Sequence, residues 1–235
     1  MTYKFGTNFG RIGTARSANL QAYYKFDGDL TDSSGNGLTL GTDAGTVRYG
    51  RIGNLQTIMF KGGLRLSLSI ANSATLQQTG ARSVHCFVCP EVVTNSATAD
   101  LFYLVGNDGA DSEARNNTAH LVIQQYQLQW LTESGSGDNN AANLDGYSLA
   151  ENVPLLITVT RDASGNVQFY LNGAAAGSAV SIPSPTGGGE GRLGVGGFFN
   201  STYDYTGAMA ELQFLNIELT AAQVLEDARK VMPWL

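Results

Sequence analysis

Residues 154–173 read PLLITVTRDASGNVQFYLNG. Two runs rich in β-branched and aromatic residues, 154–162 and 166–173, flank the turn segment DASGN. Tight turns favour Asp, Ser, Gly and Asn, because these residues tolerate or stabilise the backbone conformations that a turn needs. The stretch therefore predicts a β-hairpin, which joins two antiparallel strands.

Similar strand-like runs recur along most of the chain. They cover residues 20–26, 55–62, 64–70, 83–93, 101–106, 119–132, 192–197 and 210–217. The run LRLSLSI (64–70) alternates apolar and polar residues with the period of a strand that buries one face. About a dozen strands with little helix between them predict an all-β protein, built from two antiparallel sheets packed face to face.

One short helix is expected at the C-terminal end. Thr220 and Gln223 have the spacing of a capping box, and Val224, Ala228 and Val231 form an apolar stripe. We expect this helix to pack on the rim of the sandwich. A helix that binds a partner is the alternative.

Charge limits the classes of partner. The 235 residues carry a net charge of -6, and residues 1–19 contain Lys4, Arg11 and Arg16 but no acid, which leaves -9 on the remainder. An acidic body repels a phosphate backbone, so nucleic acid is not an expected partner. Membrane insertion is not expected either, because no stretch approaches the roughly 18 apolar residues of a membrane span.

The chain divides into an N-terminal arm, 1–19, and a single domain, 20–235, which no linker interrupts. The arm contains Tyr3, Phe5 and Phe9, and aromatic residues are uncommon in disordered tails. We expect the arm to dock on other structural proteins by adding a strand, within an oligomer or a larger assembly. A disordered terminus is the alternative.

The two cysteines, Cys86 and Cys89, lie in the strand-like segment VHCFVCPE. Their three-residue spacing places them on opposite faces of a strand, and there is no second cysteine pair to complete a metal site. Two free, packed thiols fit folding in the cytosol, as does a start without the apolar run of a signal peptide. A domain cut from a longer secreted protein is the alternative.

Five segments, in this order, resemble the laminin-G-like domains of the concanavalin A-like jelly-roll class. They are LQAYYKFDGDLTDSSGNGLTL (20–40), YGRIGNLQTIMFKGG (49–63), SVHCFVCPE (83–91), LLITVTRDASGNVQFYLNG (155–173) and GAMAELQFLNIELTAAQV (207–224). The resemblance implies two antiparallel sheets in a curved sandwich. It also implies a non-catalytic module that binds glycans or proteins through rim loops or a concave face.

Several members of this family hold a calcium ion, which takes 6 to 8 oxygen ligands. The loop FDGDLTDSSGNG (26–37) offers Asp27, Asp29, Asp32 and Asn36 as candidate ligands. The alternative is a turn in which the aspartates accept hydrogen bonds from nearby backbone N–H groups.

The resemblance also places Ala210 where relatives often have the aspartate that helps to complete a calcium site. Glu211 follows directly. Adjacent residues of a regular strand face opposite sides of the sheet, so Glu211 is not expected to replace that aspartate.

Sugar sites combine exposed aromatic rings with polar side chains, and GGFFNSTYDYTG (196–207) is the strongest such stretch. The predicted ligand-binding residues are Phe198, Phe199, Asn200, Tyr203, Asp204 and Tyr205, with Trp130 outside the loop. Trp130 could equally face the concave sheet or the core, and Tyr126 and Tyr147 are further candidates. The alternative is that half of these aromatics merely cover the ends of the sandwich.

Catalysis is not expected. Related glucanases carry E-x-D-x-x-E on a strand, which this sequence lacks, and DSE (111–113) lies in a loop rich in Asn and Gly. His85 and His120 lie in predicted strands without a nucleophile motif nearby, so each is expected to be packed or on the surface.

The sequence thus favours a non-catalytic binding and assembly module. We expect a bacteriophage virion surface protein, a capsid decoration or tail component that folds in the host cytoplasm and displays rim loops for adhesion to glycans. The alternative is a carbohydrate-binding module of a secreted bacterial protein, which would be extracellular. A glycoside hydrolase is the third possibility.

Overall fold

The computed structural model describes residues 17–70, 76, 79–93, 98–106, 116–134, 138–185, 191–197 and 203–232. The predicted arm therefore falls almost entirely outside the described residues. No helix of the described part is long and apolar enough to cross a membrane.

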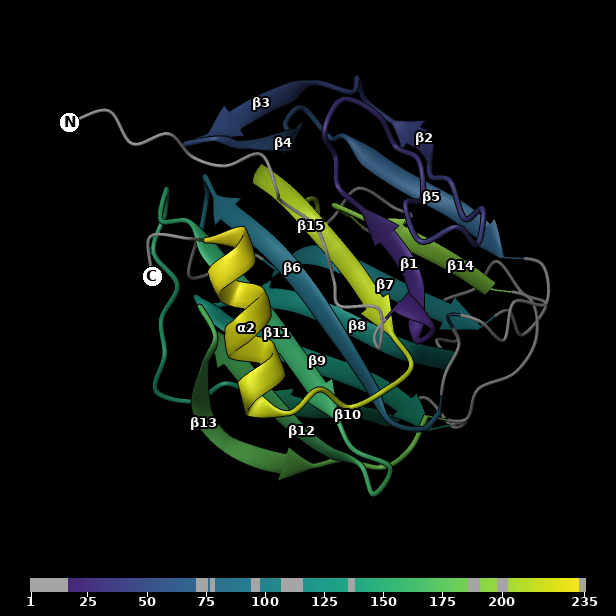
Figure 1. The fold of residues 1–235 in the computed structure, drawn as a ribbon, viewed down its shortest axis with the longest axis vertical. Helices are drawn as coiled ribbons and strands as arrows, with labels where there is room; N and C mark the ends of the chain where they lie inside the picture. The colour runs from purple at the N-terminus through teal and green to yellow at the C-terminus, as the bar shows by residue number, and fades with distance from the viewer. Residues whose placement is uncertain are drawn as a thin grey trace.

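Two antiparallel sheets form the domain, as the sequence predicts (Figure 1). The eight-stranded sheet has the order β13 (Ala174–Ser181), β12 (Asn166–Leu171), β11 (Leu155–Arg161), β6 (Arg82–Pro90), β15 (Gly207–Leu215), β4 (Leu55–Phe60), β3 (Tyr49–Ile52), and β1 (Leu20–Tyr24) also pairs with β15. The seven-stranded sheet has the order β10 (Asp138–Asn143), β9 (Gln127–Ser134), β8 (Asn116–Gln124), β7 (Thr98–Gly106), β14 (Gly191–Val195), β5 (Arg65–Ile70), β2 (Gly41–Ala44).

The core lies between the two sheets. Alternate residues of most strands point into it, and aromatic rings from both sheets meet there. Phe102 of β7 packs edge to face on Phe214 of β15, with ring centroids 5.1 Å apart. Because these contacts cross from one sheet to the other, they fix which face of each strand is inside.

The hairpin predicted at residues 154–173 is present as β11 and β12, which pair from Ile157↔Leu171 to Arg161↔Val167. Its turn depends on Asp162, whose Oδ1 accepts hydrogen bonds from the backbone N–H groups of Ser164 and Asn166, both at 2.8 Å. The Asn166 side-chain amide also donates to Asp162 Oδ2 at 2.6 Å, and this bond, followed by the backbone bonds, lowers the pKa of Asp162. The hairpin and the turn at DASGN that the sequence predicts are thus confirmed.

The C-terminal helix, α2 (Ala221–Val231), begins with the predicted capping box. The backbone N–H of Thr220 donates to Gln223 Oε1 at 2.8 Å, and the Gln223 N–H donates to Thr220 Oγ1 at 3.4 Å. The expectation that this helix packs on the rim of the sandwich is wrong. The helix lies across the outer face of the eight-stranded sheet, over β6 and β11 (Figure 1). Ala228 packs there on Phe87 and Leu156, which this sheet turns away from the core.

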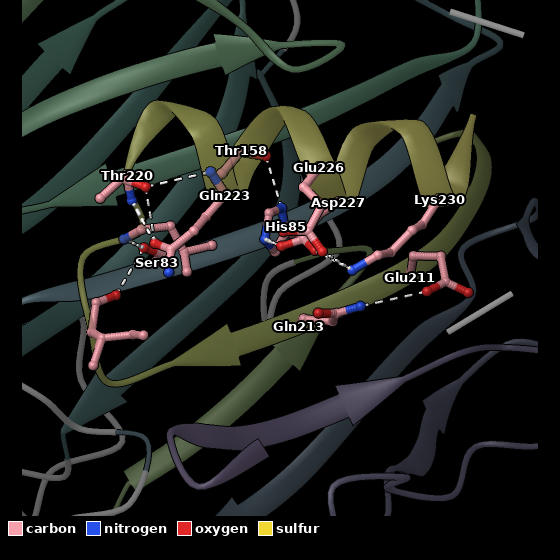
Figure 2. Close-up of polar contacts among 12 residues, drawn as sticks. Ser83, His85, Thr158, Glu211, Gln213, Thr220, Gln223, Glu226, Asp227 and Lys230 are labelled. Carbon is pink, nitrogen blue, oxygen red and sulfur yellow. Dashed lines mark hydrogen bonds and ion pairs between the residues drawn. The ribbon is translucent and has the colours of Figure 1, made fainter. Parts of the chain in front are cut away.

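A polar network fills the space beneath α2 (Figure 2). His85 Nδ1 lies 2.8 Å from Thr158 Oγ1, and His85 Nε2 lies 3.4 Å from Asp227 Oδ2 of the helix. Asp227 also faces Lys230 at 3.5 Å. His85 is therefore a packed histidine that links the sheet to the helix.

The two cysteines are free, and they lie on opposite faces of β6 as predicted. Cys86 belongs to the core between the sheets, whereas Cys89 is half-buried on the other face. Burial raises the pKa of both thiols, which keeps them protonated and poorly reactive.

A β-bulge in β15 corrects the expectation for Glu211. Ala210 pairs with Phe87 and Gln213 pairs with His85, so β15 holds one residue more than β6 between these pairs. Glu211 is the bulged residue, with a left-handed φ of 52°. The bulge turns Ala210 and Glu211 to the same outer face, because strict alternation stops at this point.

Glu211 is buried on this outer face, beside β1. The Tyr23 hydroxyl donates to Glu211 Oε2 at 2.5 Å. The Gln213 side-chain amide nitrogen lies 3.5 Å from the same carboxylate oxygen (Figure 2). Burial raises the pKa of Glu211, and the hydrogen bonds from Tyr23 and Gln213 offset only part of that effect. The negative charge of Glu211 is thus less stable in the folded chain than in the unfolded chain.

This elevated pKa predicts a pH-dependent stability. A raised folded pKa stabilises the fold below the unfolded pKa of the group, and that stability is lost as the pH rises through the folded pKa. We expect Glu211→Gln to gain free energy of unfolding relative to wild type between pH 4.5 and pH 7, by about 1.4 kcal/mol for each unit by which the pKa is raised. Urea unfolding at several pH values measures this gain.

Exposed Glu218 provides the matched control, since Glu218→Gln should follow the wild-type pH profile. Parallel stability curves for wild type and Glu211→Gln across this range would show that the buried carboxyl does not control the pH dependence.

Candidate functional site

Trp130, a predicted ligand-binding residue, lies in the core and not on the concave sheet. Its side chain is fully buried, and its ring packs edge to face on Phe102 with centroids 6.1 Å apart. A sugar cannot stack on a ring that both sheets cover. From the sequence, Trp130 could face either the concave surface or the core. The pairing of β9 with β8 turns it toward the core.

Tyr205 is also a core residue, which corrects its prediction as a ligand contact. Its ring packs on Phe60 with centroids 5.8 Å apart, and its hydroxyl donates to the Ala208 carbonyl oxygen at 3.0 Å. A Cβ on Gly207 would lie 2.5 Å from that hydroxyl, so this packing requires glycine. Tyr205 closes the end of the sandwich instead of facing solvent.

Tyr203 and Asp204 are the predicted loop residues that remain partly exposed. The Tyr203 carbonyl oxygen accepts a hydrogen bond from the backbone N–H of Asp100 at 2.9 Å, and Asp204 Oδ1 lies 3.6 Å from Arg65 Nε. Partial burial raises the pKa of Asp204, Arg65 counteracts that rise, and Asp100 adds to it. Phe198, Phe199 and Asn200, also predicted, lie outside the described residues.

The same end of the sandwich carries four of the five exposed large apolar side chains of the described part. Their exposed fractions are 36% for Tyr126, 37% for Tyr147, 46% for Val92 and 51% for Val153. Monomeric proteins expose single apolar residues commonly, but a group of them on neighbouring loops indicates an interaction surface.

Hydrogen bonds from the segment 144–154 join these loops. The Leu149 N–H donates to the Tyr126 carbonyl oxygen at 2.8 Å, and the Asn152 N–H donates to the Pro90 carbonyl oxygen at 2.6 Å. The Val93 N–H donates to Glu151 Oε1 at 3.0 Å. The turn after β8, the segment before β11 and the chain after β6 are therefore held together.

The loop of Tyr203 and Asp204 meets the same end. The Glu91 N–H donates to the Thr206 carbonyl oxygen at 2.9 Å, and Lys61 Nζ lies 2.8 Å from Glu91 Oε1. We call this surface the rim. It consists of Lys61, Glu91, Val92, Tyr126, Tyr147, Glu151, Val153, Tyr203 and Asp204.

Tyr126 is presented by a strained turn. Gln125 and Tyr126 both have left-handed backbone, with φ of 50° and 68°, in the two-residue connection between β8 and β9. Such turns normally use Asn and Gly, because a bulky residue in this conformation destabilises the fold. Strained residues of this kind are often found at functional sites. The sequence QQYQ lacks the usual turn residues, so this connection gave no local signal.

The loop 26–37 is an Asx turn in the structure. Asp32 Oδ1 accepts from the N–H groups of Tyr23 at 3.0 Å and Ser34 at 2.8 Å, and Asp32 Oδ2 accepts from Leu38 N–H at 3.1 Å and the Ser34 hydroxyl at 2.8 Å. Asn36 Nδ2 donates to the carbonyl oxygens of Leu20 and Gln21. These bonds use both carboxylate oxygens of Asp32 and the amide nitrogen of Asn36 to hold the loop on β1.

The other two candidate ligands do not complete a site. Asp29 Oδ1 accepts from the Thr31 N–H at 2.9 Å and its hydroxyl at 2.6 Å, while Asp27 is exposed. Across the described ranges, no three His, Cys, Asp or Glu side chains gather as a metal site. Calcium at this loop stays a prediction that an experiment must test.

Asp100 and His120 form a buried pair on the seven-stranded sheet, with His120 Nε2 2.8 Å from Asp100 Oδ1. Their exposed fractions are 1% and 6%, so a substrate does not reach either group. His120, like His85, is a packed histidine. The candidate segment 111–113 lies outside the described residues.

The Asx turn predicts a stabilising role for Asp32 that is independent of calcium. Asp32→Ala should lower the free energy of unfolding by about 2–4 kcal/mol, because several backbone and hydroxyl donors lose a charged acceptor. The loss should be equal in excess chelator and in millimolar calcium, and exposed Asp27→Ala should behave like wild type. A melting temperature that calcium raises in wild type, but not in Asp27→Ala, would establish an ion at this loop.

Comparison with solved structures identifies similar folds at low identity. Domain 4 of AbnA, an extracellular GH43 arabinanase from Geobacillus stearothermophilus, matches with a TM-score of 0.65 and 19% identity over 89% of this chain and 98% of that chain. The binding domain of botulinum neurotoxin serotype D/C matches with a TM-score of 0.72 and 13% identity over 92% of this chain. The present chain spans about half of that toxin domain, 53%.

The binding domain of Paraclostridial Mosquitocidal Protein 1 matches with a TM-score of 0.68 and 15% identity, over 92% of this chain and 53% of that one. No curated protein matches the chain by sequence. A family model, however, matches residues 65–225, which is well over half of the chain. The two-sheet fold and this match agree, and the chain belongs to the concanavalin A-like lectin/glucanases superfamily.

Proposed function

We propose that the domain is a non-catalytic binding module and that the rim binds a glycan. The observation that carries the proposal is the pair of exposed tyrosines, Tyr126 and Tyr147, on loops that hydrogen bonds hold together. Sugar rings stack their C–H faces on aromatic rings, and polar groups beside the rings bind the hydroxyls.

The polar groups of the rim suit such hydroxyls. Glu151, Asp204 and Tyr203 bring carboxylate and phenol groups to the same end, and each is at least partly exposed. The backbone around them is fixed by bonds to the strands, so little conformational entropy would be lost on binding.

Two structural neighbours support a glycan as the ligand. The arabinanase domain was solved in complex with arabinotriose, and the cell entry of botulinum neurotoxin type C depends on two ganglioside molecules. These ligands belong to those proteins, and the low identities carry only the fold to this chain. Binding without catalysis is favoured because the sequence lacks the E-x-D-x-x-E strand motif of the related glucanases.

For the biological context we propose display on a bacteriophage virion, with the arm 1–19 attaching the domain to other structural proteins. The support is the basic, aromatic character of the arm against an acidic body. The second candidate is a carbohydrate-binding module of a secreted bacterial protein, favoured by the likeness to a domain of an extracellular arabinanase.

A glycan array with three proteins tests the rim. Tyr126→Ala/Tyr147→Ala should lose at least tenfold in affinity for every glycan that wild type binds, since stacking contributes about 1–3 kcal/mol per ring. Tyr49→Ala is the matched control, because Tyr49 is equally exposed at 38% but lies on the edge strand β3. If the double variant and wild type bind the same glycans equally, the rim is not the site.

Removal of residues 1–16 tests the arm. This cut leaves Asn19, whose carbonyl oxygen accepts from the Asn216 N–H at 3.0 Å. We expect the truncated chain to fold with an unchanged melting temperature but to lose its oligomer or its attachment to a partner. Light scattering measures the mass, and an identical mass for both chains would refute docking through the arm.

A further inference from the structure

We infer that the rim selects uncharged sugars and disfavours glycans that carry carboxylate or sulfate groups. This inference rests on the proposed function and adds the chemical class of the ligand. Its basis is that acidic side chains outnumber basic ones on the segments around Tyr126 and Tyr147.

The acids that flank the two tyrosines are exposed. Asp145 lies two residues before Tyr147 and Glu151 four residues after it, on the segment that bonds to the Tyr126 carbonyl. Among the residues that the structure describes, no salt bridge joins Asp145 or Glu151 to a base. Glu151 Oε1 accepts only a backbone N–H, from Val93, which leaves its negative charge in place.

Two bases that the structure describes here, Lys61 of the rim and Arg65 beside Asp204, are each paired with an acid. Lys61 lies 2.8 Å from Glu91, and Arg65 lies 3.6 Å from Asp204. Arg65 is also largely covered, with 16% of its side chain exposed. Neither base is therefore free to bind an anionic ligand without losing its carboxylate partner.

The neighbouring segments add no positive charge. Residues 94–97 read TNSA and residues 198–202 read FFNST, and neither contains an ionisable acid or base. The turn QQYQ (124–127) is uncharged as well. The described residues of the rim, taken with Asp145 and Arg65, thus hold four acids, Glu91, Asp145, Glu151 and Asp204, and two bases, Lys61 and Arg65.

An anionic sugar on these rings would lie within reach of like charges. Like charges about 4–6 Å apart repel each other in water, and salt screens this repulsion over a Debye length of about 8 Å. With two carboxylates nearby we expect about tenfold weaker binding of an acidic glycan than of its neutral counterpart.

Matched glycan pairs test the inference by titration calorimetry. The neutral probe is lactose, and its acidic counterparts are 3′-sialyllactose and 3′-sulfolactose, all measured at 50 mM and 500 mM salt. A glycan array with the same kinds of pairs extends the comparison to other cores. We expect neutral members to bind about tenfold tighter at low salt and the gap to narrow at high salt.

A charge variant tests whether the effect comes from the two carboxylates that flank Tyr147, which are Asp145 beside the rim and Glu151 within it. Asp145→Asn/Glu151→Gln replaces each carboxylate by a neutral amide whose oxygen can still accept a hydrogen bond, including the one from the Val93 N–H. The variant should strengthen binding of acidic glycans five- to tenfold with little change for neutral ones. Glu218→Gln, outside the rim, should leave both classes unchanged.

The outcomes separate the two proposals. Equal or tighter binding of the acidic members, at a site that Tyr126→Ala/Tyr147→Ala abolishes, overturns the selectivity but leaves the glycan-binding rim intact. Binding of no glycan, neutral or acidic, overturns the proposed function and the selectivity with it.

Discussion

Burial of one face of each sheet against the other is the constraint on which the rest of the structure depends. Phe102, Phe214 and Trp130 meet across the two sheets, and their packing decides which alternate residues point inward. This burial takes Trp130 and Tyr205 away from any ligand. The loops at the ends of the strands then remain available for ligand contact, and the packed sheets hold these loops in fixed positions.

The outer face of the eight-stranded sheet also buries apolar side chains, and a β-bulge interrupts its regular pattern. It is covered by α2 because Phe87, Leu156 and Ala210 would otherwise expose apolar surface. The bulge at Glu211 puts a carboxyl group on that face beside Tyr23, where a regular strand would have turned it to the core. The same residue carries the elevated pKa that links stability to pH.

At the rim, hydrogen bonds between distant segments bring together two tyrosines whose proximity no local sequence pattern predicts. Tyr126 occupies a left-handed turn without Gly or Asn, and Tyr147 lies in a loop with no strand pattern. They are brought to one surface because the segment 144–154 bonds both to the Tyr126 turn and to the chain after β6. The glycan-binding proposal rests on that juxtaposition of segments far apart in sequence.

The sequence by itself determined the all-β class, the Asp162 hairpin and the capped C-terminal helix, because period-two patterning, turn chemistry and capping are local properties. It also offered the Asx turn as one of two possibilities for Asp32. Only the tertiary structure decided which way Trp130 and Tyr205 face, where α2 packs, and that Glu211 shares a face with Ala210. These depend on strand pairing and register, which contacts between distant segments select and which no local pattern encodes.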